Sequence, residues 1–261
     1  MDYIGLAQKA ALGAGELLRE NFGKVLDIEY KAKNSLVTEI DRISEELIIE
    51  IIRDKFPSHS IFAEESGRDG RDSGHLWIID PLDGTTNYTH TYPFFSVSIA
   101  LEIDGEIKLG VVYDPLKNEM FSGEKGDGAS LNNRPMKVSV TSSVEESCLC
   151  TGFIHTKDWM VEENLKHFGN FIRRSRALRR DGSAALDLCY VACGRFDGFW
   201  ELGLNPWDTA AGFLICEEAN GLVTDFSGKR FDVHNQELVA TNGKIHDEMI
   251  RVLKLARGKR N

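Results

Sequence analysis

The segment from Trp77 to Asn87 (WIIDPLDGTTN) limits what this chain can fold into more than any other part of the sequence. Its apolar start predicts a buried strand that runs directly into Asp80. Proline has no backbone N–H group, so we expect the hydrogen-bonded ladder to stop at Pro81 and the chain to turn. Such a turn brings the carboxylate of Asp83 round to face the carboxylate of Asp80.

Two carboxylates that face one point repel each other unless a cation lies between them. Ligands that are all oxygen suit a hard ion such as Mg²⁺. Gly84 allows the backbone to approach a ligand closely, and Thr85-Thr86 is typical of a helix start whose free N–H groups hold an anion. The segment therefore predicts a phosphate group beside a divalent cation. Asp80 taken alone is more typical of a capped turn.

Three further acidic positions have a setting that suits a ligand site. Glu64 follows the apolar run 60–63 and precedes a polar loop, Asp208 lies in the first turn of a helix that Pro206 opens, and Asp41 lies in the first turn of an earlier helix. Each also has a simpler interpretation. Glu64 fits an exposed acidic turn, and the two aspartates fit a favourable interaction with a helix dipole.

Composition places the chain among ordinary globular proteins. Its 31 basic and 41 acidic side chains give a formal net charge of −10, which argues against broad electrostatic binding to nucleic acid or to an anionic membrane. No apolar run approaches the length of a transmembrane helix, and the N-terminus lacks the pattern of a secretory signal. We therefore expect a soluble, cytoplasmic protein. Its five cysteines lack the paired spacing of a zinc site and are expected to be reduced thiols.

The remaining pattern alternates between helices and strands. Helical periodicity covers about residues 2–21, 38–55, 159–174, 183–193, 206–219 and a last segment from 245. Strand patterns cover 60–63, 76–79, 96–102, 107–113 and 196–200 and recur near Leu222 and Leu238, with a hairpin turn at Asp104-Gly105. The pattern predicts a mixed α/β fold in one unit, with approximate halves 1–145 and 146–261.

The second of these helices, at about residues 38–55, is expected to turn one apolar face towards the core. That face consists of Ile40, Ile43, Leu47, Ile48, Ile51 and Ile52.

Two motifs together resemble a known family. Residues 80–87 (DPLDGTTN) match the first signature of the inositol monophosphatase family, and residues 207–212 (WDTAAG) match its second signature. Glu64-Glu65-Ser66 stands at the upstream spacing of the same family, and residues 182–188 and 195–198 look most like its bacterial branch. The resemblance extends from Asp2 to the last helix. It implies a sugar-phosphatase-like fold in five layers, α-β-α-β-α, with mixed and antiparallel sheets, usually as a homodimer.

The resemblance also implies a set of metal ligands. Glu64, Asp80 and the backbone carbonyl of Leu82 would hold a first Mg²⁺ ion, and Asp80, Asp83 and Asp208 would hold a second. A weaker third ion would be held by Glu64 and waters, and Mn²⁺ would be a substitute for Mg²⁺.

Further roles follow from the same resemblance. Thr85 and Asp41 would orient the attacking water, so that with Glu64 they form the catalytic set. The substrate-binding set would be Asp83, Gly84, Thr85, Gly182, Ser183, Ala184, Glu201 and Asp208, of which the Gly84 and Thr85 N–H groups cradle the phosphate and Glu201 meets hydroxyl groups of the alcohol.

The activity implied is Mg²⁺-dependent hydrolysis of inositol 1-phosphate by a metal-activated water, with sensitivity to Li⁺. A cysteine or serine nucleophile fits poorly, because the chain has no Cys-x5-Arg loop and Ser183 has no obvious base beside it. One alternative is a dual inositol monophosphatase and fructose-1,6-bisphosphatase. Another is a role in transcription and ribosomal RNA synthesis through a protein partner, independent of catalysis.

An arginine cluster from Arg173 to Arg180 bears on these alternatives. Charge runs are usually solvated, so a strand edge or an interface is the simpler interpretation. The functional interpretation is that Arg179 or Arg180 reaches a second anionic group of the substrate, or that the cluster docks a partner.

Overall fold

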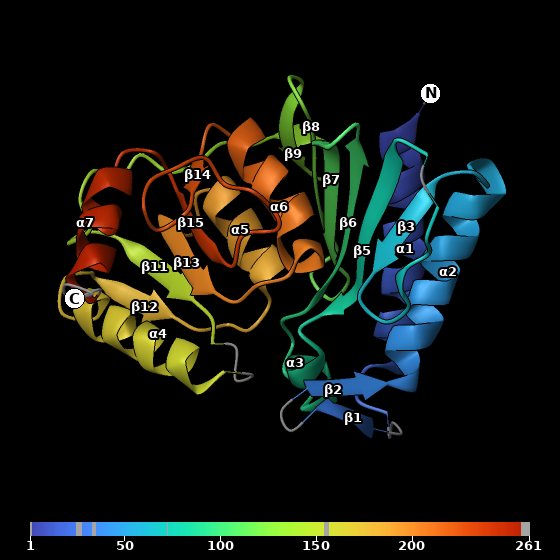
Figure 1. Cartoon of the computed structure of the whole chain (residues 1–261), viewed down its shortest axis with the longest axis horizontal. Coiled ribbons are helices and arrows are strands. Elements are labelled where there is room, and N and C mark those ends of the chain that lie inside the picture. The colour runs from blue at the N-terminus through green and yellow to red at the C-terminus, as the bar shows by residue number, and fades with distance from the viewer. Residues whose placement is uncertain (1, 25–27, 33–34, 72, 154–156, 257–261) are drawn as a thin grey trace.

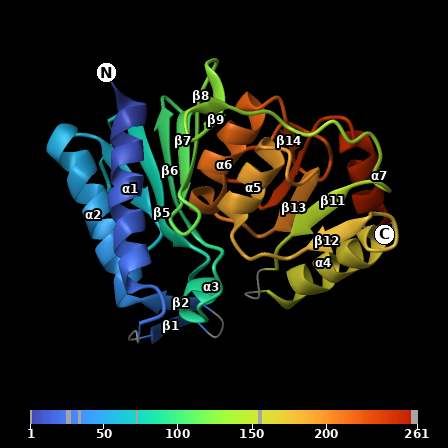
Figure 2. The same ribbon diagram turned by 180° about the vertical axis from the view of Figure 1, so that it is seen from behind.

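The structure of the chain is a computed structural model that describes residues 2–24, 28–32, 35–71, 73–153 and 157–256. Its main elements stack in the order helices, sheet, helices, sheet, helices, as Figure 1 and the reverse view in Figure 2 show. The mixed α/β fold in five layers is therefore confirmed. None of the helices in the described ranges is long and apolar enough to cross a membrane.

The first layer consists of α1 (Tyr3–Asn21) and α2 (Glu39–Lys55). Asp2 caps α1 by accepting a hydrogen bond of 2.8 Å from the Gly5 amide. Alanines on its inner face allow α1 to lie close to the neighbouring sheet. The prediction for Ile43 is wrong, because 41% of its surface is exposed. Polar side chains of α2 occupy part of the buried face instead and turn Ile43 outward.

The large sheet has the strand order β10-β9-β8-β7-β6-β5-β3-β4 and is antiparallel except between β3 and β5. Its strands are β3 (Ser60–Ala63), β4 (Gly67–Arg68), β5 (His75–Asp83), β6 (Ser96–Ile103), β7 (Glu106–Asp114), β8 (Glu119–Glu124), β9 (Gly128–Leu131) and β10 (Arg134–Pro135). Helices cover both of its faces, which is why β6 is buried continuously from Ser96 to Leu101. Asp104 and Gly105 both have positive φ, as the predicted hairpin turn requires.

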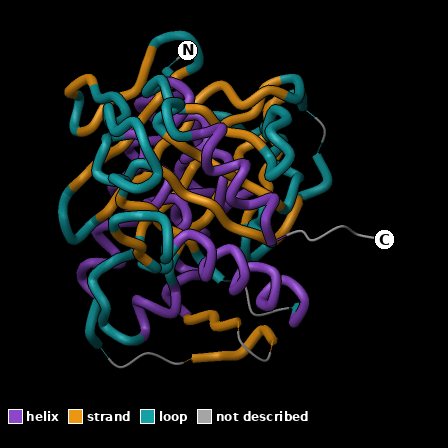
Figure 3. The backbone as a smooth tube through the Cα atoms, turned by 90° about the vertical axis from the view of Figure 1, so that its left-hand side faces the viewer, coloured by secondary structure: helices purple, strands orange, loops and turns teal. Residues whose placement is uncertain are grey.

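The smaller sheet is mixed and has the order β12-β11-β13-β15-β14. Its strands are β11 (Cys148–Thr151), β12 (Ala177–Arg179), β13 (Gly198–Leu202), β14 (Leu222–Thr224) and β15 (Glu237–Thr241), and α4 (Asp158–Phe171) and α7 (His246–Ala256) form the outer layer against it. A separate hairpin of β1 (Ile28–Ala32) and β2 (Ser35–Thr38) lies at one end of the molecule (Figure 3). The sequence patterns did not predict β1, β2, β4 or β11.

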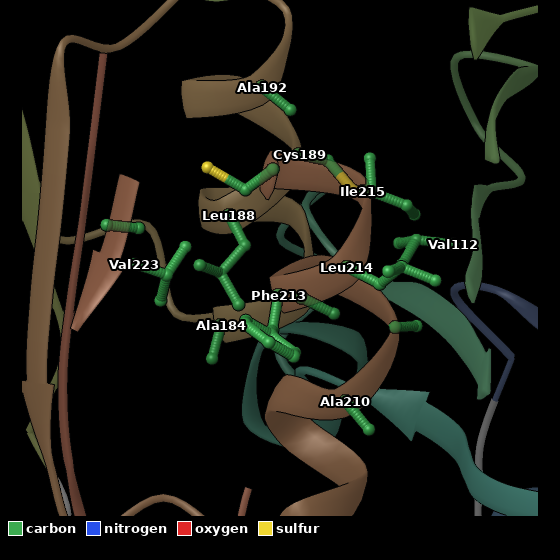
Figure 4. Packing of buried hydrophobic residues seen from close by; sticks show 14 of the residues in the cluster. Val112, Ala184, Leu188, Cys189, Ala192, Ala210, Phe213, Leu214, Ile215 and Val223 are labelled. Carbon is green, nitrogen blue, oxygen red and sulfur yellow. The ribbon is translucent and has the colours of Figure 1, made fainter. Parts of the chain in front are cut away.

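Two helices fill the middle layer, α5 (Ala184–Ala192) and α6 (Pro206–Glu218). Figure 4 shows Leu188 of α5 and Ile215 of α6 packed between Val112 of the large sheet and Val223 of the smaller one. Gly212 makes the close approach of these helices possible, because a Cβ there would lie 2.7 Å from the Cβ of Leu188. The five cysteines are all free thiols, as expected.

Candidate active site

The acidic end of β5 is shaped by an irregularity at Pro81. Asp80 pairs with Ser98 of β6, the ladder is interrupted over two residues, and Asp83 pairs with Ser96. The expected stop at Pro81 is thus a local interruption, after which the strand resumes. Leu82 donates its N–H to Asp80 Oδ1 at 3.0 Å, which fixes the buried Asp80 carboxylate at the interruption.

Glu64 is brought beside Asp80 by strand pairing. β3 and β5 are parallel neighbours, so their carboxyl ends meet at the same edge of the sheet. Glu64 directly follows β3, and its amide donates to the carbonyl oxygen of Ile79 at 3.1 Å.

Asp208 reaches the same place from α6. Pro206 opens this helix, and Asn205 and Asp208 form a capping box in which the Asn205 amide donates to Asp208 Oδ2 at 2.6 Å. The expected place of Asp208 in the first turn is confirmed.

The electrostatics show that the four carboxylates act on one another. Burial raises the pKa of Asp80 well above its usual range, and the charges of Glu64, Asp83 and Asp208 raise it further. Burial raises the pKa of Asp83 to about 6, against hydrogen bonds that favour its ionised form. Burial and the charge of Asp83 also raise the pKa of Asp208. Such a cluster is stabilised by any cation that it can bind.

The donor set fits a hard divalent ion. The four carboxylates and the Leu82 carbonyl are all oxygen, which is the ligand chemistry of Mg²⁺ and Mn²⁺. Within the described ranges, no three acidic, histidine or cysteine side chains already stand so that they could hold a metal ion together. Asp83 accepts a hydrogen bond from Ser183, and Asp208 accepts one from the backbone amide of Asn205.

A polar pair adjoins the cluster. Thr85 Oγ1 lies 3.1 Å from Asp41 Oδ1 and 3.1 Å from the carbonyl oxygen of Leu82. Asp41 is completely buried on α2. The structure thus brings together the two residues expected to orient water.

Gly84 precedes the short helix α3 (Thr85–Thr89) with a φ of 100°. A Cβ at this position would lie 3.1 Å from the carbonyl oxygen of Phe94 and 3.3 Å from that of Gly182. Glycine is therefore required by conformation and by space, as the close backbone approach predicted from the sequence implies.

The remaining predicted residues line a cavity of about 180 Å³. Its lining includes Asp83, Gly182, Ser183, Ala184, Glu201 and Asp208, which come from both halves of the chain. Larger hollows lie elsewhere, including one of about 1090 Å³ beside α1 and α2, but Asp83 and Asp208 of the acidic cluster line the small cavity. Burial raises the pKa of Glu201 well above its usual range, and the charge of Arg180 opposes that rise.

The surroundings of Ser183 differ from the expectation that no base lies beside its hydroxyl group. Its hydroxyl donates to Asp83 Oδ2 at 2.6 Å, so a carboxylate does lie beside it. The same hydroxyl also caps α5 by accepting from the Leu186 amide at 3.4 Å. These bonds give Ser183 a structural role in holding Asp83.

Sequence reasoning missed four residues that line the cavity, namely Gly152, Phe153, Asp187 and Leu204. Two of them have unusual surroundings. Gly152 lies against Glu201, and a Cβ there would collide with the Glu201 carboxylate. Asp187 on α5 is buried, and its Oδ1 has no hydrogen-bond partner among the residues that the structure describes. No local pattern identifies either, because both follow from contacts between distant segments.

The arginines of the cluster from Arg173 to Arg180 lie in different parts of the structure. β12 is an edge strand, which agrees with the strand edge predicted from the charge run. Arg180 lines the cavity, whereas Arg173 and Arg174 donate to carbonyl oxygens at the end of α4.

Comparison with known proteins relates this architecture to one family. The family model described as "Inositol monophosphatase family" matches residues 2–256. An inositol-1-monophosphatase of Synechocystis sp. is 45% identical over 253 residues, which are 96% of this chain and 88% of that protein. A Nus factor SuhB of Pasteurella multocida is 43% identical over 250 residues, 95% of this chain and 94% of that protein. The solved structure of extragenic suppressor protein suhB from Bartonella henselae has a TM-score of 0.94 at 38% identity, covering 97% of this chain and 99% of that one.

Proposed function

Because the chain belongs to the inositol monophosphatase family, we propose that it is a Mg²⁺-dependent phosphatase that hydrolyses inositol 1-phosphate to inositol and phosphate. The observation that carries the proposal is the meeting of four mutually interacting carboxylates beside the Gly84 backbone and the Thr85–Asp41 pair. Phosphoryl transfer needs this combination of charge neutralisation and positioning more than it needs a covalent nucleophile.

Under the proposal, Glu64, Asp80, Asp83, Asp208 and the Leu82 carbonyl would hold two Mg²⁺ ions or more, with Mn²⁺ as a substitute. The bound ions would supply Lewis acidity, which lowers the pKa of a coordinated water and neutralises charge on the phosphate and the leaving oxygen. Li⁺ would inhibit by replacing one of the ions.

The chain's own residues would position the nucleophile. Thr85 Oγ1 donates to Asp41 Oδ1, which leaves lone pairs on Thr85 to accept a hydrogen bond from a water. That bond would orient the water oxygen towards phosphorus, and the water proton would pass through Thr85 Oγ1 to Asp41. Glu64 would complete the catalytic set.

The substrate would lie between the two halves of the chain. The Gly84 and Thr85 N–H groups would hold the phosphate, and Glu201 would accept hydrogen bonds from hydroxyl groups of the alcohol. Gly182, Ser183 and Ala184 line the same cavity and would complete the pocket. Like the family's usual form, the active protein is proposed to be a homodimer and cytoplasmic.

A substrate panel tests the proposal. Phosphate release with Mg²⁺ is measured for inositol 1-phosphate, fructose 1,6-bisphosphate, histidinol phosphate and 3′-phosphoadenosine 5′-phosphate, and kcat/KM values are compared. A clear lead for inositol 1-phosphate supports the assignment. An equal or higher value for the bisphosphate would support the dual phosphatase and a role for Arg180, which lines the cavity, in binding a second phosphate. No turnover of any substrate would contradict a phosphatase function.

The role in transcription is kept as the alternative, since relatives of similar identity are named Nus factor SuhB. Those names fit this role without favouring it. An Asp83→Asn variant separates the two functions, because it removes a proposed metal ligand but leaves the outer surface of the protein unchanged. Loss of turnover with retained binding to transcription proteins would show that both functions coexist.

A further inference from the structure

Helix α2 buries three polar side chains on the face that it turns towards the active site. Asp41 and Ser44 are completely buried, and Glu45 is 3% exposed. Their spacing of three and four residues places them on one side of the helix. Burying two carboxyl groups and a hydroxyl is unfavourable unless each finds a hydrogen-bond partner, so the partners show what this face of α2 does.

Each of these side chains contacts a different segment of the site. Asp41 accepts from Thr85 at the start of α3. Ser44 Oγ donates to the carbonyl oxygen of Pro81 at 3.0 Å, within the irregularity of β5. Glu45 contacts the segment that follows β3. One helix therefore touches the segment after β3, the irregular end of β5 and the start of α3, while the fourth proposed carboxylate ligand, Asp208, is carried by α6.

The contact of Glu45 is the most specific of the three. Its Oε2 accepts from the Glu65 amide at 2.8 Å, and its Oε1 accepts from the Ser66 amide at 2.9 Å. The preceding residue, Glu64, is fixed on its other side by the bond from its amide to the Ile79 carbonyl oxygen. The backbone at Glu64 is thus held between β5 and the Glu45 carboxylate.

We propose that Glu45 is a positioning residue for metal binding, which holds the 64–66 backbone so that Glu64 faces Asp80 and its neighbours. This inference rests on the proposed function, because it takes Glu64 as a metal ligand. Ordering the segment before the ion arrives removes a conformational cost from ion binding. Groups that orient metal ligands commonly change metal affinity by about 10- to 100-fold when they are removed.

A glutamine at position 45 cannot replace the carboxylate. It offers one acceptor oxygen, and its NH₂ group would face a backbone N–H, which is also a donor. Glu45→Gln therefore loses at least one of the two bonds. Glu46→Gln is the matched control, because Glu46 is the next residue of α2, is exposed, and undergoes the same chemical change.

The test measures Mn²⁺ binding to the metal-free full-length protein by electron paramagnetic resonance, without substrate. We expect Glu45→Gln to weaken the affinity by about 10- to 100-fold and Glu46→Gln to stay within about twofold of the wild type. We also expect higher Mg²⁺ to restore most of kcat in Glu45→Gln, with the KM for the phosphate ester little changed at saturating Mg²⁺. A purely structural role would lower thermal stability without this dependence on the ion.

Two further results decide against the inference. Wild-type affinity in a folded Glu45→Gln variant would overturn it while the metal site stands. Absence of Mn²⁺ binding in the wild type would overturn both the inference and the proposed function. If Glu45→Gln does not fold, the Mn²⁺ affinity of Glu45→Asp is measured instead, since aspartate keeps the charge but is too short to accept hydrogen bonds from both amides.

Hydrogen exchange of the Glu65 and Ser66 amides tests the contact without metal. Both amides should be protected in the wild type, and rapid exchange there would contradict the contact.

Discussion

Ser183 and Asp83 lie 100 residues apart in the sequence and are joined by a hydrogen bond of 2.6 Å from the Ser183 hydroxyl to Asp83 Oδ2. The Ala185 amide donates to the same oxygen at 2.8 Å. Two donors at the start of α5 therefore bind the Asp83 carboxylate at the end of β5. The two halves of the chain are in contact at this point. Both bonds favour the ionised form of Asp83, while burial opposes it and raises its pKa to about 6.

The first prediction concerns the pH dependence of metal binding. A carboxylate must lose its proton to bind an ion, so Mn²⁺ affinity should fall as the pH drops and the proposed ligands with raised pKa values, Asp80, Asp83 and Asp208, become protonated, Asp83 with a pKa of about 6. Removing a donor from the ionised form raises a pKa, so Ser183→Ala should move this fall to higher pH. The measurement is Mn²⁺ affinity from pH 5 to 8.

Ser147→Ala is the control for that shift. Ser147 is as fully buried as Ser183, but its hydroxyl donates to the Ser143 carbonyl oxygen, away from the acidic cluster. Its pH profile should match the wild type. Identical profiles for Ser183→Ala and the wild type would show that the bond to Ser183 does not set the titration of Asp83.

The second prediction concerns Asp80. Replacement by asparagine should lower kcat by about 10²- to 10³-fold or more, because the side chain interacts electrostatically with the other three carboxylates and is proposed to bridge two ions. The same change removes a buried acid whose ionisation Glu64 and Asp83 oppose. The metal-free variant should therefore unfold at a temperature equal to or above that of the wild type near neutral pH. Near-normal kcat, measured by phosphate release, would contradict the bridging role.

The third prediction concerns Gly152. A methyl group here would displace the Glu201 carboxylate, which is proposed to bind substrate hydroxyls. Gly152→Ala should lower kcat/KM for inositol 1-phosphate by about tenfold or more, since buried polar groups discriminate strongly when they lose their partners. Turnover of p-nitrophenyl phosphate, which has no such hydroxyls, should change much less. An equal loss for both substrates would mean that Gly152 does not act through Glu201.

Gly13→Ala provides the comparison for that variant. Gly13 lies within α1, and a Cβ there would make only ordinary contacts of 3.7 and 3.8 Å with Leu47 and Ile51. Alanine is favoured over glycine inside a helix by about 0.5–1 kcal/mol, so this variant should be slightly more stable and should keep both activities.

The residues that could be predicted from the sequence are those whose roles are local. Asp80, Asp83 and Gly84 stand in a short run at the end of one apolar segment, and Asp208 follows a proline at a helix start, so pattern and spacing place them. Their meeting in space was implied by the resemblance to a family, and in the structure the charges of Glu64, Asp83 and Asp208 raise the pKa of Asp80. Periodicity also placed most of the helices within a few residues.

The parts that could not be predicted depend on contacts between distant segments. The strand β11 is short and has no alternating pattern of its own, and it is stabilised as a strand by pairing with β12 and β13 in the smaller sheet. Glu45 looks like any charged residue of an amphipathic helix until its partners, two backbone amides 20 and 21 residues away, are known. Ile43 fits the apolar period but is exposed, because polar contacts take its place on the buried face.

The last prediction concerns stability away from the active site. His246 at the start of α7 is buried, with its ring nitrogens 2.9 Å from Thr224 Oγ1 and 3.0 Å from Thr241 Oγ1. Burial lowers the pKa of His246, and the nearby charge of Asp247 opposes this only in part. The folded state therefore binds a proton less readily than the unfolded state, whose histidine titrates near about 6.5.

Because the pKa of His246 is lower in the folded state than in the unfolded state, protonation of His246 destabilises the fold. The contribution of neutral His246 to stability is complete above pH about 6.5 and is lost as the pH falls towards the folded-state pKa, by up to about 1.4 kcal/mol for each unit of depression. His246→Gln has no such titration, so the stability difference between the wild type and this variant should shrink as the pH falls from 7.5 to 5. Urea unfolding at each pH measures this difference, with His234→Gln as the control at an exposed histidine. A difference that stays constant with pH would show that His246 titrates alike in both states.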